Sequence, residues 1–258
     1  MATIITLTTD FGTADGFVGA MKGVMLSLTP HATLVDITHE IPPHDIRSGT
    51  FALETAVPHF PPEAIHVAVV DPGVGSERAA ILVETERGRF LAPDNGVLTS
   101  VVPDMDAACI FALDRPEFWR PDVSATFHGR DVFAPVAAHL ANGVRPEQLG
   151  TLTARMERLP WPQPQRCGDE IRGEVIHVDR FGNLITNLRL EDLGKMRQSA
   201  CFRLRDFEIR GITPHYAAGD GLMAVVNSGG RIEIALPSAP AAQTLNIDVG
   251  EEIWVLSV

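Results

Sequence analysis

The stretch VAVVDPGVGSER, residues 67–78, gives the strongest indication of how this chain folds. Its first four residues are apolar, which is typical of a strand buried in a sheet. The apolar run stops at Asp71, and the Pro-Gly-Val-Gly sequence that follows indicates a tight turn. Ligands of open α/β sheets bind at the carboxyl ends of the strands, so Asp71 is a candidate site residue.

The residues before this stretch alternate between short β-type runs and helical spacing. We predict strands over 3–8, 33–38 and 65–70, and helices over 18–27 and 46–59. This β-α-β-α-β order predicts a mostly parallel sheet with helices on its faces. Two further strands, over 79–85 and 89–92, and a helix over 131–142 are expected to follow.

Composition changes at LPWPQPQ, residues 159–165, where three prolines alternate with polar or aromatic residues. Such a segment is typical of an extended, semi-rigid linker. We therefore divide the chain into an N-terminal α/β domain (1–157), a proline-rich linker (158–168) and a C-terminal β domain (169–258). The last contains short β-type runs at 171–178, 184–188, 200–204, 222–226, 231–236 and 252–258, which predict a small barrel or sandwich.

Charge and composition exclude several classes of protein. The 258 residues carry a formal net charge of −12, so the clustered basic surface of a nucleic-acid-binding protein is not expected. The three cysteines show no CxxC spacing, which predicts neither a disulfide framework nor a cysteine zinc site and favours a reducing cytoplasm. We find neither a signal-peptide pattern nor an apolar run near 18 residues, so no membrane association is expected.

Two further residues can join Asp71 through tertiary folding: Arg78, and His128 in the motif TFHGRD (residues 126–131). A carboxylate, a guanidinium and an imidazole together are suited to orienting and polarising a small nucleophile such as water. Each residue also has a purely structural interpretation. Asp71 can belong to an ordinary strand-turn, Arg78 can be a surface charge, and His128 can be a hydrogen-bonded core residue.

Two other polar segments of the N-terminal domain have open interpretations. Asp10 ends the first strand, where a carboxylate can accept hydrogen bonds from a ribose diol or merely cap a turn. THEIPPHD (residues 38–45) places His39, His44 and Asp45 near one another, which raises metal binding as a competing chemistry. Two prolines separate the histidines, and the chain has no HExxH motif, so metal binding is disfavoured.

The C-terminal domain contains two polar turns. In DRFGNLITN (residues 179–187), Asn183 can donate and accept hydrogen bonds, which suits the edge of an adenine ring. The alternative is that the segment is simply a hairpin turn. Residues 227–230, Asn-Ser-Gly-Gly, form either a tight turn or a cradle for a carboxylate. Tyr216 is the chain's single tyrosine and could stack on a base.

Taken together, these segments resemble the S-adenosyl-L-methionine (SAM) hydroxide adenosyltransferase family, the adenosine-forming SAM hydrolases related to bacterial fluorinase and chlorinase. The resemblance covers nearly the whole chain through TLTTDFG, FVGAMKGV, VDITHEIPPHDI, VAVVDPGVGSER, APDNG, TFHGRDVFAPVAAHL, VDRFGNLITN and NSGGRIEIA. It implies an N-terminal Rossmann-like domain, with a mostly parallel sheet and helices on both faces, followed by a β-barrel-like domain. It also implies cleavage of SAM at C5′ by water or hydroxide, giving adenosine and L-methionine. No cofactor is implied, because SAM is the substrate.

The resemblance further implies a role for each candidate residue. The family's water-activating triad is matched by Asp71, Arg78 and His128, and its ribose-binding acid by Asp10. Asp179 and Ser228 match positions that hold the amino and carboxylate groups of methionine. Asn183 matches an adenine contact, and Tyr216 is more loosely placed as a residue that stacks on adenine. A homotrimer is implied, with each site in the seam between one subunit's N-terminal domain and its neighbour's C-terminal domain.

The halogenating relatives differ from this chain at the nucleophile. They carry a tyrosine where this chain has Asp71, and they lack a counterpart of His128, which favours water over halide here. Gly129 is small, as in the chlorinase, so this position alone does not exclude a halide. The alternatives are therefore a SAM-dependent halogenase, a non-catalytic adenosine- or SAM-binding protein, and a metal-dependent hydrolase.

Overall fold

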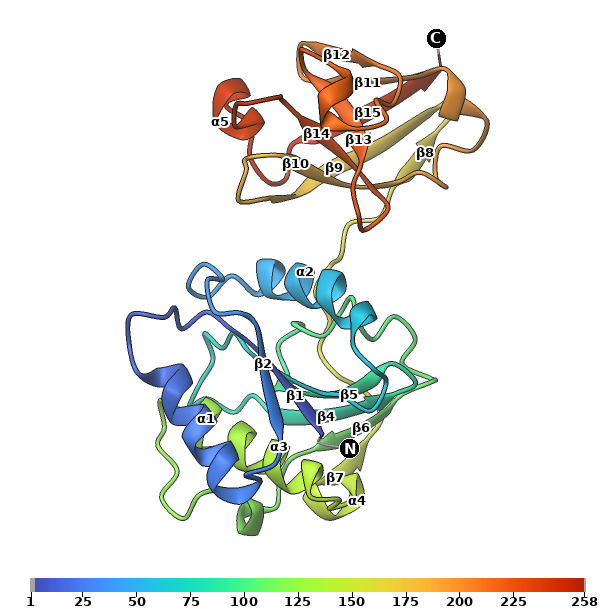
Figure 1. The fold of residues 1–258 in the computed structure, drawn as a ribbon. Coiled ribbons are helices and arrows are strands. Elements are labelled where there is room, and N and C mark those ends of the chain that lie inside the picture. Colours follow the sequence, from blue (N-terminus) through green and yellow to red (C-terminus); the bar gives the residue numbers. More distant parts are fainter. Residues whose placement is uncertain (1–2, 258) are drawn as a thin grey trace. The chain divides into compact units, whose positions relative to one another are not determined.

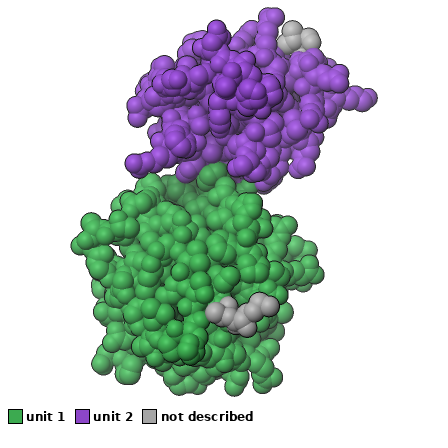
Figure 2. Space-filling model, viewed as in Figure 1, with its two compact units in different colours: residues 1–160 green, residues 161–258 purple. Residues whose placement is uncertain are grey.

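The computed structural model describes residues 3–257, and its contacts divide the chain after Pro160 into two compact units (Figures 1 and 2). Unit 1 contains a seven-stranded sheet, and unit 2 an eight-stranded one. Val258, the last residue of the strand expected over 252–258, lies outside the described residues. No helix within 3–257 is both long enough and apolar enough to cross a membrane.

The sheet of unit 1 has the strand order β2-β1-β3-β5-β4-β6-β7. Its parallel pairs join β2 (Thr33–Thr38) to β1 (Ile4–Thr9), β1 to β3 (Ile65–Val69), and β3 to β5 (Gly88–Pro93). Its antiparallel pairs join β5 to β4 (Ala80–Thr85), β4 to β6 (Cys109–Ala112), and β6 to β7 (Thr151–Thr153). Because β5 and β6 both run against β4, they share a direction. The predicted mostly parallel sheet is therefore confirmed, although β6 and β7 were not expected.

Helices cover both faces of this sheet, as predicted (Figure 1). Helices α1 (Phe17–Leu28) and α3 (Ala134–Ala141) pack on one face, in a core that includes Val67 and Val69 of β3. Helix α2 (Ile46–Ala56) packs on the other face, in a core that includes Ala68. Successive side chains of a strand point to opposite faces, so the continuous apolar run of β3 reflects burial on both.

Two predicted helices differ in detail from the structure. The helix expected over 46–59 is α-helical only to Ala56 and continues as a 3₁₀ turn, Val57–His59. The helix expected over 131–142 begins with a π-helical turn, Gly129–Phe133, before α3. In that wide turn the main-chain N–H of Ala134 donates to the carbonyl of Gly129, five residues earlier. A short helix, α4 (Pro146–Leu149), precedes β7.

Unit 2 is an antiparallel, barrel-like sheet with the order β12-β11-β15-β9-β10-β14-β13. Its strands are β9 (Glu170–Val178), β10 (Leu184–Arg189), β11 (Ala200–Leu204), β12 (Phe207–Arg210), β13 (Met223–Val226), β14 (Arg231–Ala235) and β15 (Glu252–Ser257). The terminal strands β12 and β13 contact each other, which nearly closes the sheet. The predicted β-barrel-like character is confirmed. Strand β12 and the short helix α5 (Ala241–Leu245) were not expected.

Strand β9 holds the two halves of this sheet together. Its first half pairs with β15 and its second half with β10. Gly173 lies where a Cβ would be 2.7 Å from both the Oδ1 of Asn187 and the Cγ of Leu188, so β10 approaches too closely for any side chain there. The start of β9 also pairs with β8 (Gln165–Cys167), which lies within the segment we assigned to the linker.

Candidate functional site

The carboxyl ends of β1 and β3 bring two of the candidate acids to one edge of the unit 1 sheet. The strands are parallel neighbours, and Thr9 of β1 lies opposite Val69 of β3. Asp10 follows Thr9 directly, and Asp71 follows Val69 by two residues. Both acids therefore leave the sheet at the edge where ligands of such folds bind.

Arg78 joins Asp71 to His128. Its Nε donates to Oδ1 of Asp71 at 3.0 Å, and its Nη2 forms an ion pair with Oδ2. The same Nη2 lies 2.8 Å from Nδ1 of His128. The Asp71 side chain is 4% exposed and that of Arg78 is 10% exposed, so both charges are largely removed from water. The three residues expected to act together are thus brought into one hydrogen-bonded group.

The contact with Arg78 determines which nitrogen of His128 carries a proton. A guanidinium has only donors, so Nδ1 of His128 must accept. Burial lowers the pKa of His128, and the nearby charge of Arg78 lowers it further, against a smaller opposing effect of Asp71. The imidazole is therefore neutral near pH 7, with its proton on Nε2. In this state His128 can donate a hydrogen bond through Nε2, while Asp71 can accept one.

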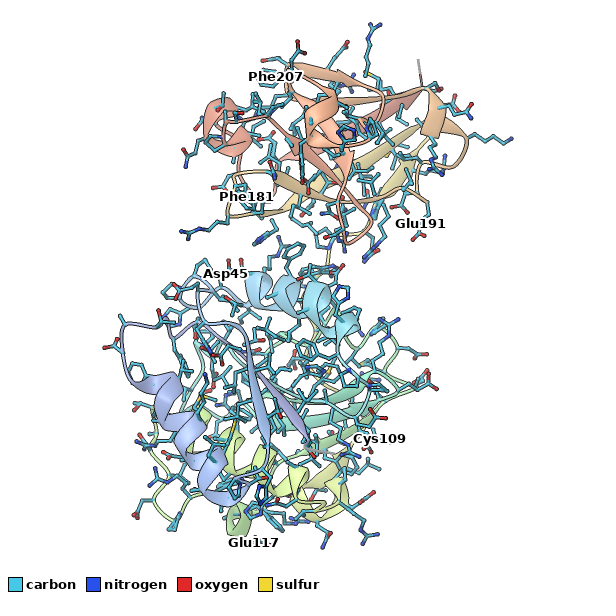
Figure 3. The ribbon with its side chains drawn as sticks, in the orientation of Figure 1. Asp45, Cys109, Glu117, Phe181, Glu191 and Phe207 are labelled. Atoms are coloured by element: carbon cyan, nitrogen blue, oxygen red, sulfur yellow. The ribbon has the colours of Figure 1, made fainter. Side chains whose placement is uncertain are left out.

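The THEIPPHD segment supports Asp10. The main-chain N–H of His44, a residue with a positive φ of 68°, donates to Oδ2 of Asp10 at 2.8 Å. Asp45, labelled in Figure 3, caps α2 by accepting from the main-chain N–H of Ser48 at 3.0 Å. Between residues 3 and 257, no group of three or more His, Cys, Asp or Glu side chains is placed to hold a metal ion.

His39 belongs to the same support. Its Nδ1 lies 2.8 Å from the hydroxyl of Thr9, the residue before Asp10. Its main-chain carbonyl accepts from the N–H of Gly12 at 2.8 Å. Both ends of the turn that carries Asp10 are therefore attached to the segment after β2. From the sequence, His39 was a candidate only as a metal ligand, because its pairing with Thr9, 30 residues away, leaves no local signal.

An aromatic cluster lies next to these polar residues. Phe11, which follows Asp10, lies 5.8 Å from Phe127, which precedes His128, measured between ring centroids. Phe17 lies 5.3 Å from Phe127. A Cβ on Gly129 would lie 3.1 Å from the Sδ of Met21 and 3.3 Å from the ring of Phe11. The packing of this cluster therefore accounts for the small residue at position 129 without reference to the nucleophile.

Asp179 and Asn183 form one part of a second polar group, in unit 2. Oδ1 of Asp179 accepts from the main-chain N–H of Asn183 at 2.8 Å, and Oδ2 accepts from its side-chain amide at 3.0 Å. Phe181, between them, is 78% exposed (Figure 3). The segment is thus the tight turn expected from its sequence, and it orients the amide of Asn183.

Glu233 of β14 joins this group to the other predicted residues of unit 2. The hydroxyl of Tyr216 donates to Glu233 at 2.6 Å, which together with burial raises the pKa of Tyr216 to about 12. Burial raises the pKa of Glu233, and the charge of Asp179 adds to this effect. A side-chain hydrogen bond joins Glu233 to Asn227, next to the exposed Ser228. Sequence reasoning missed Glu233, although a charged residue inside the apolar run RIEIA was an available signal.

The comparisons with known proteins agree over both units. A family model described as the SAM hydroxide adenosyltransferase N-terminal domain matches residues 5–150, and one described as the C-terminal domain matches residues 173–254. A curated (R)-S-adenosyl-L-methionine hydrolase of Salinispora arenicola is 40% identical over 97% of each chain. A fluorinase of Nocardia brasiliensis is 27% identical over 98% of this chain and 96% of its own. A solved structure, of an uncharacterized conserved protein from Thermotoga maritima, matches with a TM-score of 0.90 and 35% identity, covering 98% of this chain and 99% of that one.

Proposed function

Because this chain belongs to the SAM hydroxide adenosyltransferase family, we propose that it is an adenosine-forming SAM hydrolase. A water oxygen forms a bond to C5′ of SAM while the bond from C5′ to the sulfonium breaks. The products are adenosine, L-methionine and one proton. The observation that carries this proposal is the hydrogen-bonded group of Asp71, Arg78 and His128. In the proposal, its carboxylate accepts from the attacking water and its imidazole donates to the same water.

The leaving group explains why Asp71, Arg78 and His128 would all serve the nucleophile. A sulfonium departs as a neutral thioether, so no acid is needed to protonate it. The catalytic residues therefore need only align the attacking water, exclude the surrounding solvent and accept the proton that the water loses. Water alone balances this reaction, and no cofactor takes part in the proposal.

We assign the roles within the group from the direction of the hydrogen bonds. The Nε2–H of His128 donates to the water oxygen and orients it, since Nδ1 is occupied by Arg78. The Asp71 carboxylate accepts the proton that the water loses. Arg78 holds the other two in place and balances the charge of the carboxylate. An imidazole at this position can serve as a proton acceptor or as an orienting residue, and the bond from Arg78 to Nδ1 favours the second role for His128.

The remaining predicted residues bind the substrate in this proposal. Asp10 holds the ribose hydroxyls: its Oδ2 is bonded to the main-chain N–H of His44, and Oδ1 has no partner among the described residues. Asp179 and Ser228 hold the methionine amino and carboxylate groups. Two neighbouring acids, Asp179 and Glu233, favour a cation such as the methionine ammonium. Asn183 contacts adenine, and the half-exposed Tyr216 stacks on it.

Incubation with SAM in ¹⁸O-labelled water tests the function directly. We expect adenosine and L-methionine in equal amounts, with the label in the 5′-hydroxyl of adenosine. Added chelator should leave the rate unchanged, and added chloride should give no 5′-chloro-5′-deoxyadenosine. Tight adenosine binding without SAM turnover would instead identify a binding protein, and loss of activity with chelator a metal-dependent hydrolase.

We further propose that the protein is a cytoplasmic homotrimer whose sites each combine unit 1 of one subunit with unit 2 of its neighbour. All three cysteines, at positions 109, 167 and 201, are unpaired, which suits a reducing compartment. Unit 1 holds the residues assigned to the water and the ribose, and unit 2 holds those assigned to methionine and adenine.

Mixed trimers provide a test of the shared site. Asp71→Ala and Asp179→Ala proteins, each impaired alone, are unfolded together and reassembled. If sites form between subunits, about one seam in four pairs an intact unit 1 with an intact unit 2, so about a quarter of wild-type activity should return. Sites confined to one chain would return none. Sedimentation of the wild-type protein as a monomer would also contradict the proposal.

A further inference from the structure

The loop that follows β5, residues Asp94–Gly96 of the APDNG motif, has no role in the function described above. Strand β5 lies between β3 and β4 in the sheet. Asp71 comes shortly after the carboxyl end of β3, and Arg78 comes shortly before the start of β4. Because β4 runs against β5, all three points meet at the same edge. The loop after β5 therefore lies between the two ends of the segment that carries Asp71 and Arg78.

Two hydrogen bonds fasten those ends to the loop. The side-chain amide of Asn95 donates from Nδ2 to the main-chain carbonyl of Val70 at 2.9 Å. The main-chain N–H of Asp94 donates to the carbonyl of Ala79 at 2.8 Å. Val70 immediately precedes Asp71, and Ala79 immediately follows Arg78. Adjacent residues of one loop thus hold both boundaries of the 71–78 segment.

The orientation of the Asn95 amide is determined by its other bond. Its Oδ1 accepts from the main-chain N–H of Val97 at 3.2 Å, so Nδ2 must face Val70. Val70 is fully buried, and a carbonyl in such a place needs a partner. The Asn95 side chain therefore supplies the buried Val70 carbonyl with a hydrogen bond that bulk water cannot reach to replace.

The loop is itself held from behind. Oδ1 of Asp94 accepts from the main-chain N–H of Glu157 at 2.7 Å. Gly96 has a positive φ of 92°, and a Cβ there would lie 2.7 Å from the Cγ of Leu159. These contacts restrict movement of the loop. The loop can therefore hold the 71–78 segment in one position.

We propose that Asn95 is a positioning residue for the Asp71–Arg78 pair. Its amide fixes the peptide group between Val70 and Asp71, and with it the direction in which the carboxylate points. This inference rests on the proposed function, because the pair it positions is the one assigned to hold the attacking water. Asn95 itself touches neither water nor SAM in this scheme.

Kinetics of Asn95→Asp and Asn95→Ala test this role. The aspartate variant keeps the size of the side chain and the acceptor for Val97, but it cannot donate to Val70. We expect kcat for SAM hydrolysis to fall about 10- to 100-fold in both variants, because a displacement of about 1 Å costs up to ~10²-fold. The KM for SAM should stay within about threefold of the wild-type value, since no substrate contact is removed.

Asn142→Ala is the matched control. The side-chain amide of Asn142 also donates to a main-chain carbonyl, that of Leu28, at 2.9 Å, but it lies at the end of α3. Because this bond is exposed, the variant should lose less thermal stability than the Asn95 variants, and it should keep its kcat. All rates are expressed per folded protein, measured by circular dichroism, so that instability is not mistaken for loss of catalysis.

Two outcomes would overturn the inference. If the Asn95 variants have wild-type kcat, or lose no more than Asn142→Ala, the amide does not position the pair. A wild-type protein that releases no adenosine overturns the proposed function, and this inference with it. Active wild-type protein with unaffected Asn95 variants overturns the inference alone.

Discussion

Replacing Asp71 with asparagine is expected to lower kcat for SAM hydrolysis about 10²- to 10⁴-fold, the usual contribution of a well-placed proton acceptor. The amide keeps the shape of the side chain but is a far weaker base. In Asp71→Ala, kcat should fall at least as far. This change also leaves the guanidinium of Arg78 without its largely buried partner. In both variants SAM should still bind measurably in a calorimetric titration, because in the proposed mechanism Asp71 contacts the attacking water and not SAM.

The control for Asp71→Asn is Glu84→Gln. Glu84 accepts from the Nε of Arg89 at 2.9 Å, so this change also converts an arginine-paired carboxylate of unit 1 into an amide. The pair lies on β4 and β5, and each side chain is more than a third exposed. We expect the Glu84 variant to keep wild-type kcat. Equal turnover in the Asp71 and Glu84 variants would remove Asp71 from the mechanism.

Replacing His128 with alanine is expected to lower kcat about 10²- to 10³-fold and to change the pH profile. In the wild-type protein, protonation of Nδ1 would place two donors, His128 and Arg78, against each other. Activity should therefore fall as the pH falls through the pKa of His128, which burial and the charge of Arg78 hold below its usual 6.5. The wild-type rate should consequently be flat near pH 7 and decline in more acidic solution. His128→Ala should lack this decline.

His139→Gln provides the comparison for the pH profile. Burial also lowers the pKa of His139, which lies on α3 and takes no part in the proposed site. Its replacement should leave both kcat and the acidic decline unchanged. Retention of the decline in His128→Ala, or its loss in His139→Gln, would assign the titration to a group other than His128.

The sheet of unit 1 was predictable because its central strands carry an unambiguous pattern. The apolar run of β3 ends at an acid and a turn, and the segments before it alternate between strand and helix. Strands β6 and β7 have four and three residues, too few for a periodicity to develop. They are strands because the edge of β4 that does not pair with β5 pairs with β6, and β6 in turn pairs with β7. That pairing is a tertiary property, which a local pattern does not contain.

The same distinction separates the predicted and unpredicted parts of the candidate site. Asp71 and Asp10 were found because strand ends can be located in the sequence. The bond from Asn95 to Val70 joins residues 25 positions apart, and that from His39 to Thr9 joins residues 30 apart. Asn95 and His39 thus each bond a residue next to a candidate acid. Their contribution could not be predicted, because the partner is brought close only by the folding of the chain.

The π-helical turn at Gly129–Phe133 limits how the segment between His128 and α3 can vary in length. An α-helix advances by about 100° per residue around its axis. Deleting one residue from 129–133 would tighten the wide turn into an ordinary one and rotate everything before it by about that angle relative to α3. The imidazole would then swing away from the guanidinium even though every side chain involved was retained. Shortening this helical turn by one residue should therefore affect the site as severely as removing the histidine.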